Sequence, residues 1–117
     1  LINSYMSTSI TILSNTAHPG DSTNQSVTGD KYKGDGYYGR SDGLHTVQYT
    51  YSDLVGTITI QATLATDPAS EDWFDVHSYT AATETGSKIA NFTGNYVWVR
   101  ANLEYTAGTV DSINLNN

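Results

Sequence analysis

The chain has 117 residues, which is enough for one domain built around one hydrophobic core. Charged residues make up 15% of it and hydrophobic residues 38%, so much of its polarity comes from Ser, Thr and Asn. A net charge of −7, with only five Lys and Arg residues, argues against nucleic acid as a partner, because binding to phosphates requires clustered cations.

The absence of cysteine rules out disulfides and thiolate metal sites. No apolar run approaches the roughly twenty residues that span a bilayer, so we expect no membrane association through a spanning helix. The N-terminal residues LINSYMSTSITIL carry no positive charge, and we therefore expect no secretory signal peptide.

The N-terminal third is predicted to begin with a strand and continue as a long connecting region. Residues Met6–Leu13 predict the first strand, and Ser14–Gly43 form a Gly/Tyr-rich region that is far longer than an ordinary loop. Such a region is either functional or partly ordered by short strands, of which Ser26–Lys31 is a candidate. The glycines of Gly34–Gly39 indicate tight turns.

The middle of the chain shows the period of two that is typical of half-buried strands. The strand predicted over Leu44–Tyr51 has one face made by His45, Val47, Tyr49 and Tyr51. After a turn at Ser52–Gly56, a second strand, Thr57–Ala65, has an apolar face made by Ile58, Ile60, Ala62 and Leu64.

Turn signals and further strands fill the next segment. Pro68 lies in a turn over Thr66–Ser70, because proline fixes φ and removes a backbone donor. We predict a strand over Glu71–Tyr79, a polar loop over Thr80–Lys88 and a short strand over Ile89–Phe92.

The C-terminal segment repeats the alternating pattern. The strand predicted over Tyr96–Tyr105 has an apolar face made by Val97, Val99, Ala101 and Leu103, which places Trp98 on the outer face. A turn at Ala107–Gly108 and a strand over Thr109–Leu115 follow. About eight antiparallel strands between turns predict an all-β fold, a β-sandwich of jelly-roll or galactose-binding-like type, in a single domain over residues 1–117.

Neither metal binding nor catalysis has a matching motif. His18, His45 and His77 lack the short spacing of zinc ligands, and His45 is in phase with Val47, which favours a packed histidine. The aspartates of the long region do not match an EF-hand, although a calcium ion held by loop carboxylates stays an alternative; they are Asp30, Asp35 and Asp42. We predict no cofactor.

Carboxylates beside an aromatic residue also occur in sugar-cleaving enzymes. Here Glu71, Asp72 and Asp75 surround Trp73, but the sequence contains no GxSxG, HExxH or P-loop motif. We therefore predict that the protein is not an enzyme.

The long region offers a contact surface instead. Tyr37, Tyr38 and Arg40 combine exposed aromatic rings with a cation, a composition typical of protein interfaces and of glycan-binding surfaces. A purely structural use, in which these rings pack the loop onto the sandwich, is the alternative. With Trp98, these three residues are the predicted partner or glycan contacts.

Three segments resemble small virion structural proteins of tailed phages, best represented among marine T4-like phages. These segments are YKGDGYYGRSDGLHTVQY, GTITIQATLATDPASEDWFDV and NFTGNYVWVRANLEYTAGTVDSINLNN, and the resemblance covers roughly Lys31 to Asn117. It implies a non-enzymatic β-sandwich located on the virion, as capsid decoration or cement or as a tail-associated component. Its partners would be the major capsid protein or a tail protein, together with further copies of itself.

A carbohydrate-binding module is the alternative function. Such a module would recognise a glycan, for example on a host surface, with Trp98, Trp73 or the loop tyrosines as stacking platforms. Nearby Asn and Asp side chains would supply hydrogen bonds.

Overall fold

The structure, a computed structural model, describes residues 9–39 and 43–116. It confirms the predicted all-β antiparallel architecture, with seven strands among the described residues where about eight were predicted. The strands are β1 (Ile10–Leu13), β2 (Thr16–Ala17), β3 (Gln25–Thr28), β4 (Tyr32–Lys33), β5 (Leu44–Thr63), β6 (Phe74–Thr93) and β7 (Trp98–Asn116). Two short 3₁₀ turns, η2 (Asp35–Tyr38) and η3 (Ser70–Asp72), lie in connections. No helix in the described part of the chain is long and apolar enough to cross a membrane.

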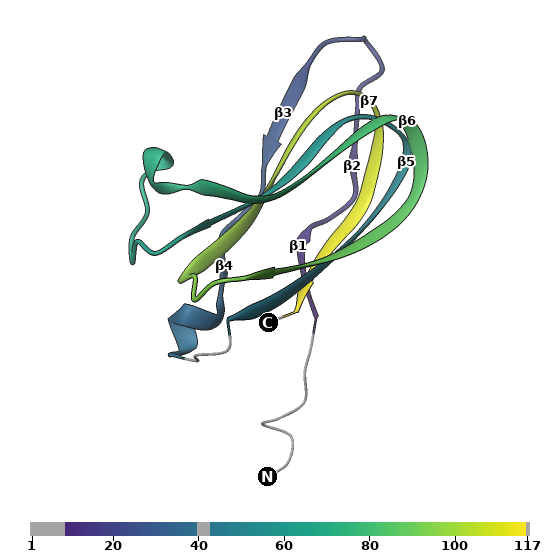
Figure 1. Cartoon of the computed structure of the whole chain (residues 1–117). Helices are drawn as coiled ribbons and strands as arrows, with labels where there is room; N and C mark the ends of the chain where they lie inside the picture. Colours follow the sequence, from purple (N-terminus) through teal and green to yellow (C-terminus); the bar gives the residue numbers. More distant parts are fainter. Residues whose placement is uncertain (1–8, 40–42, 117) are drawn as a thin grey trace.

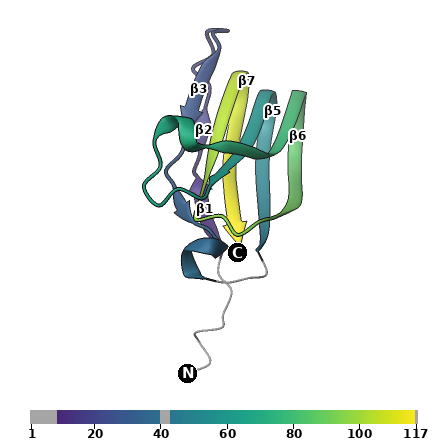
Figure 2. The ribbon, with the colours of Figure 1, turned by 60° about the vertical axis from the view of Figure 1, so that its left-hand side comes forward.

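All strands belong to one sheet, in which β7 is a central strand. On one side β7 pairs with β5, and on the other it pairs in turn with β1, β2, β3 and β4, which together act as one interrupted strand. The other long strand, β6, pairs with β5 alone and forms an edge. Figure 2 shows β7, β5 and β6 side by side in this order.

The three long strands are bent, and the bend turns one sheet into a sandwich. Strands β5 and β6 have 20 residues each and β7 has 19. A straight strand of that length would span about 65 Å at roughly 3.3 Å per residue, whereas the longest dimension of the molecule is 48 Å. In Figure 1 the three strands curve together, so that their two halves face each other.

A row of residues with left-handed backbone conformation crosses the sheet at the bend. Asp53 in β5, Thr83 in β6 and Gly108 in β7 have φ values of 51°, 65° and 93°. The pairing registers of β5 with β6 and with β7 shift at the same place, as expected for β-bulges. The Asp53 N–H donates to Thr85 Oγ1 at 2.8 Å, which holds two of the bent strands together.

The core lies between the two layers that the bend creates. The first layer contains β1, β2 and residues 44–52, 84–93 and 109–116, and the second contains β3, β4 and residues 56–63, 74–81 and 98–105. In β5 the buried positions are odd-numbered before the bend and even-numbered after it, because the bulge shifts the alternation. They are His45, Val47, Tyr49, Tyr51, Leu54, Ile58, Ile60 and Ala62, and the one exception to the alternation is Thr63, which is buried at the end of the strand.

Three predicted turns or loops are wrong because they belong to the bend. Ser52–Gly56 lies within β5, Thr80–Lys88 lies within β6, and Ala107–Gly108 lies within β7. The segment over 80–88 is polar because an edge strand at a bend exposes most of its side chains while its backbone remains paired with β5. The strand predicted from Glu71 begins only at Phe74.

The predicted long region 14–43 is partly ordered by short strands. Strands β2, β3 and β4 and the turn η2 lie within it, and residues 40–42 lie outside the described part. The first strand is described from Ile10 onward, since residues 6–8 also lie outside that part. Leu64, predicted to face the core, lies beyond the end of β5 and is 70% exposed.

Tyrosines join the two layers beside the edge strand β6. The Tyr49 hydroxyl lies 3.0 Å from His77 Nε2, and the Tyr51 hydroxyl donates to the Tyr79 hydroxyl at 3.0 Å. Tyr79 in turn donates to Glu84, and this hydrogen bond raises the pKa of the Tyr79 phenol above its ordinary value. Burial raises the pKa of the Tyr49 phenol. The layers therefore meet through polar contacts as well as apolar packing.

The bend provides a direct test of the fold. We expect Gly108→Ala to lower the free energy of unfolding by about 2–4 kcal/mol. Alanine is strained at the positive φ of this position, and its Cβ would overlap the backbone of β5. That Cβ would lie 2.3 Å from the Asp53 carbonyl oxygen. Urea denaturation followed by tryptophan fluorescence measures the change.

Gly86→Ala is the matched control in β6, another of the three bent strands. Its added Cβ would meet only the Tyr51 hydroxyl, at 3.8 Å, so we expect a change of less than about 1 kcal/mol. Equal destabilisation by the two substitutions would contradict the role assigned to Gly108.

Candidate functional site

Aromatic and cationic side chains gather on the outer face of the second layer, at the end of the molecule opposite the bend. In β7, Val99 and Ala101 are buried, so Trp98 and Arg100 point outward by alternation. The outward position predicted for Trp98 is confirmed. Residues 64–73, which connect β5 to β6, and the turn η2 border the same end of this face.

Trp98 holds these bordering segments in place. Its indole N–H donates to the Thr66 carbonyl oxygen at 2.9 Å, and its ring lies 5.1 Å from the ring of Tyr37 in η2. The Lys31 ammonium lies 4.9 Å from its ring centroid, as a cation–π contact. Trp98 is therefore already engaged by protein groups and serves as an anchor more than as an open stacking platform.

Trp73 lies next along the face and is fixed by Arg100. The guanidinium carbon of Arg100 lies 4.3 Å from the Trp73 ring centroid, and its Nε donates to Gln61 Oε1 at 2.8 Å. The amide of Gln61 donates in turn to Asp75 at 3.0 Å. Partial burial lowers the pKa of the Arg100 guanidinium, which nevertheless stays protonated at neutral pH.

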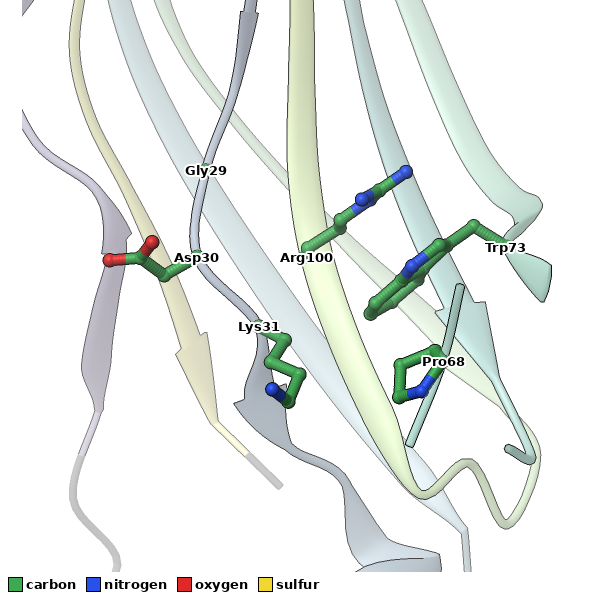
Figure 3. Close-up of a pocket in the computed structure, with 6 residues that line it drawn as sticks. All are labelled: Gly29, Asp30, Lys31, Pro68, Trp73 and Arg100. Carbon is green, nitrogen blue, oxygen red and sulfur yellow. The ribbon is translucent and has the colours of Figure 1, made fainter. Parts of the chain in front are cut away.

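A pocket of about 430 Å³ opens beside these side chains, and we call it the Trp73 pocket. It is lined by Gly29, Asp30, Lys31, Pro68, Trp73 and Arg100 (Figure 3). Figure 3 shows that Trp73 and Arg100 point toward each other, whereas the carboxylate of Asp30 points away from both. The pocket thus combines an aromatic ring with hydrogen-bond donors.

Cations are concentrated here although the protein is acidic. Lys31, Lys33 and Arg100 are three of the five Lys and Arg residues in a chain of net charge −7. The Lys33 ammonium lies 4.6 Å from the ring centroid of Tyr37, and Lys31 and Arg100 line the Trp73 pocket. Carboxylates lie at this end as well, among them Asp30 in the pocket lining, so the cations form a local cluster within an acidic protein.

The structure brings together part of the predicted contact set. Tyr37 and Tyr38 are 46% and 48% exposed, and their rings pack edge to face at 5.7 Å. Tyr37 also meets Trp98, so these three predicted residues form one aromatic cluster. Arg40, the fourth, lies outside the described residues.

The predicted contact set did not include Arg100 or Lys31. Arg100 follows Trp98 by two positions, so the alternation that places Trp98 outward places Arg100 on the same face. That signal was present in the sequence. No local signal in the sequence indicates that Lys31 lies near Trp98, because this contact depends on the pairing of β4 with the start of β7.

His45 fixes the base of the turn that carries Tyr37 and Tyr38. It is buried, as predicted, and its ring stacks on Phe92 with centroids 5.0 Å apart. The Asp35 N–H donates to Nε2 at 3.1 Å, so the neutral ring carries its proton on Nδ1, which lies 2.9 Å from the Gly43 carbonyl oxygen.

Asp35, one of the three loop aspartates, forms a hydrogen bond with the backbone. The Gly43 N–H donates to the buried carboxylate of Asp35 at 2.8 Å. Among the described residues, no group of three His, Asp or Glu side chains could hold a metal ion, and Asp42 lies outside them.

The acids beside Trp73 also have structural partners. The Ala69 N–H donates to Asp72 at 2.8 Å, which closes the turn η3, and Asp75 accepts from Gln61. Phe74 points to a different, more apolar pocket that it shares with Leu64 and Tyr96. The carboxylates therefore support the connection between β5 and β6.

The anchoring role of His45 can be tested by substitution. We expect His45→Phe to lower the free energy of unfolding by about 1–3 kcal/mol, because the stack on Phe92 is kept while the Asp35 N–H loses its acceptor. The Gly43 carbonyl oxygen keeps the hydrogen bond from the Gly94 N–H. Hydrogen exchange at the Asp35 amide should accelerate in parallel. Gln48→Ala, an exposed change in the same strand, should leave both measurements unchanged; acceleration there as well would contradict the role of His45.

Comparison with known proteins yields only remote structural likenesses. No protein-family model matches the sequence, and no curated protein matches it significantly. The fold is similar to CBM29_1, a family 29 carbohydrate binding module from Piromyces equi, with a TM-score of 0.47 and 8% identity over 93% of this chain and 90% of that one. It is also similar to a carbohydrate binding module, CBM6cm-2, from Cellvibrio mixtus lichenase 5A in complex with cellotriose, with a TM-score of 0.44 and 15% identity over 94% and 96% of the two chains. At this level of similarity we infer no function from either protein.

Proposed function

We propose that the protein is a non-catalytic carbohydrate-binding β-sandwich, and that the Trp73 pocket receives a sugar ring. The observation that carries this proposal is a partly exposed indole, fixed in orientation by Arg100, at a pocket with charged hydrogen-bond donors. Because Arg100 covers one face of the Trp73 ring, the C–H face of a pyranose would pack on the other face, while its hydroxyl groups require polar partners at the rim. Lys31 and Arg100 supply such partners.

The position of the pocket also suits binding of a chain of sugars. Trp73 and Arg100 lie on the outer face of the second layer, and the cluster of Trp98, Tyr37 and Tyr38 lies toward the end of the same face. A glycan that occupies the Trp73 pocket could extend past Lys31 to these rings, because Lys31 both lines the pocket and contacts Trp98.

The carboxylates near the pocket do not favour hydrolysis. Glycoside hydrolases use two carboxyl groups that face the scissile bond. Here Asp72 and Asp75 accept hydrogen bonds from Ala69 and Gln61, and Asp30 points away from Trp73. These contacts support a binding role over a catalytic one.

The virion role drawn from sequence resemblance stays a prediction. It is compatible with glycan binding, since a receptor-binding domain on a particle surface would use such a pocket on a host glycan. Detection of this chain in purified particles by mass spectrometry would support that location.

Binding to a glycan array, followed by titration calorimetry with the best oligosaccharide, tests the proposal. We expect Trp73→Ala to weaken binding by about tenfold or more, because the apolar face of the sugar loses its stacking partner. Phe74→Ala is the control, because Phe74 is 68% exposed and adjacent in sequence but lines the other pocket. Failure to bind any glycan, or equal loss with both variants, would contradict the proposal.

A further inference from the structure

We propose that the Trp73 pocket selects an anionic sugar, one whose carboxylate or sulfate group is held by Arg100 and Lys31. This inference rests on the proposed carbohydrate binding and adds the chemical class of the ligand. It follows from two observations. Arg100 and Lys31 contact aromatic rings and an amide, and neither forms an ion pair with a described carboxylate.

Arg100 is a fixed cation without an acidic partner. Its Nε is used by Gln61 and its planar face by Trp73, so the orientation of the guanidinium is set. Within the described chain, its two terminal nitrogens donate to no acceptor and it forms no ion pair. A guanidinium held in this way presents two parallel N–H donors, which is the arrangement that binds an oxyanion in a bidentate manner.

Neither Asp75 nor Asp30 forms an ion pair with Arg100. Asp75 reaches only the amide of Gln61, which separates it from the guanidinium by one side chain. Asp30 lines the pocket but points away from Arg100 (Figure 3). A partly buried cation that lacks a counter-ion gains from a bound anion, because the anion replaces lost hydration.

Lys31 supplies the second charge, and Trp73 supplies the sugar platform. Lys31 lines the same pocket and also makes no ion pair with another described residue. An anionic group on a pyranose stacked on Trp73 would therefore lie between the guanidinium of Arg100 and the ammonium of Lys31. A neutral sugar would leave both charges without an anionic partner, which is the physical basis for selectivity.

A matched pair of ligands isolates the charge. We would titrate the protein with trigalacturonate and with its fully methyl-esterified form, and separately with a sulfated carrageenan oligosaccharide and its desulfated form. The expected result is about tenfold or tighter binding of the charged member of one pair, and a preference that weakens as salt rises from 50 to 300 mM. The pair that shows the preference identifies the carboxylate or the sulfate as the group recognised.

Variants assign the preference to the two cations. Arg100→Gln and Lys31→Gln should each reduce the ratio of charged to neutral affinity, by about threefold or more for a preference of about tenfold. Lys88→Gln makes the same change in net charge on β6, where Lys88 contacts Tyr79, and should leave the ratio unchanged. Circular dichroism verifies that each variant is folded. If Arg100→Gln does not fold, the affinity ratio of Lys31→Gln alone tests the inference.

The outcomes separate this inference from the proposed function. Equal binding of charged and neutral members, lost in Trp73→Ala, would overturn the anionic selectivity and keep carbohydrate binding. An equal loss of the ratio in Lys88→Gln would reduce the effect to net charge and would also overturn the inference. No binding to any oligosaccharide would overturn both.

Discussion

The bend across β5, β6 and β7 is the constraint on which the rest of the structure depends. A single sheet of this length has one apolar face and cannot cover it alone. At Asp53, Thr83 and Gly108 the left-handed backbone turns that face onto itself, so both sides of the core come from the same strands. The bend also determines which end is open, and the connections that carry Trp73 and Tyr37 meet at that end.

The core was largely predictable from the sequence, but the bend was not. Alternation correctly assigned Val47 and Tyr49 before the bend and Ile58 and Ile60 after it. The segments between these runs looked like turns because bulged strands contain the same residues as turns, such as Gly108. Alternation reports which face a side chain takes, and it does not reveal whether the chain leaves the sheet between two runs.

The candidate site was predictable only in part, for a related reason. Trp98 was correctly placed outward, yet its freedom to bind depends on Tyr37 and Lys31, which are distant in sequence. Trp73 had been weighed as a platform, but its pairing with Arg100 arises from the pairing of β7 with β5 and from the connection before β6. Contacts between segments far apart in the chain left no local signal.

The bulge in β5 has a consequence for how this protein could change during evolution. Because the inward positions switch from odd to even at residues 52–55, loss or gain of one residue there would turn half of a core strand toward solvent. The connection over residues 64–73, which contributes Pro68 and Trp73, carries no such phase relationship. A change of length in this connection would therefore alter one wall of the pocket and leave Arg100 on an unchanged strand frame. Ligand preference in this architecture could diverge through the connection alone, without any change to the core.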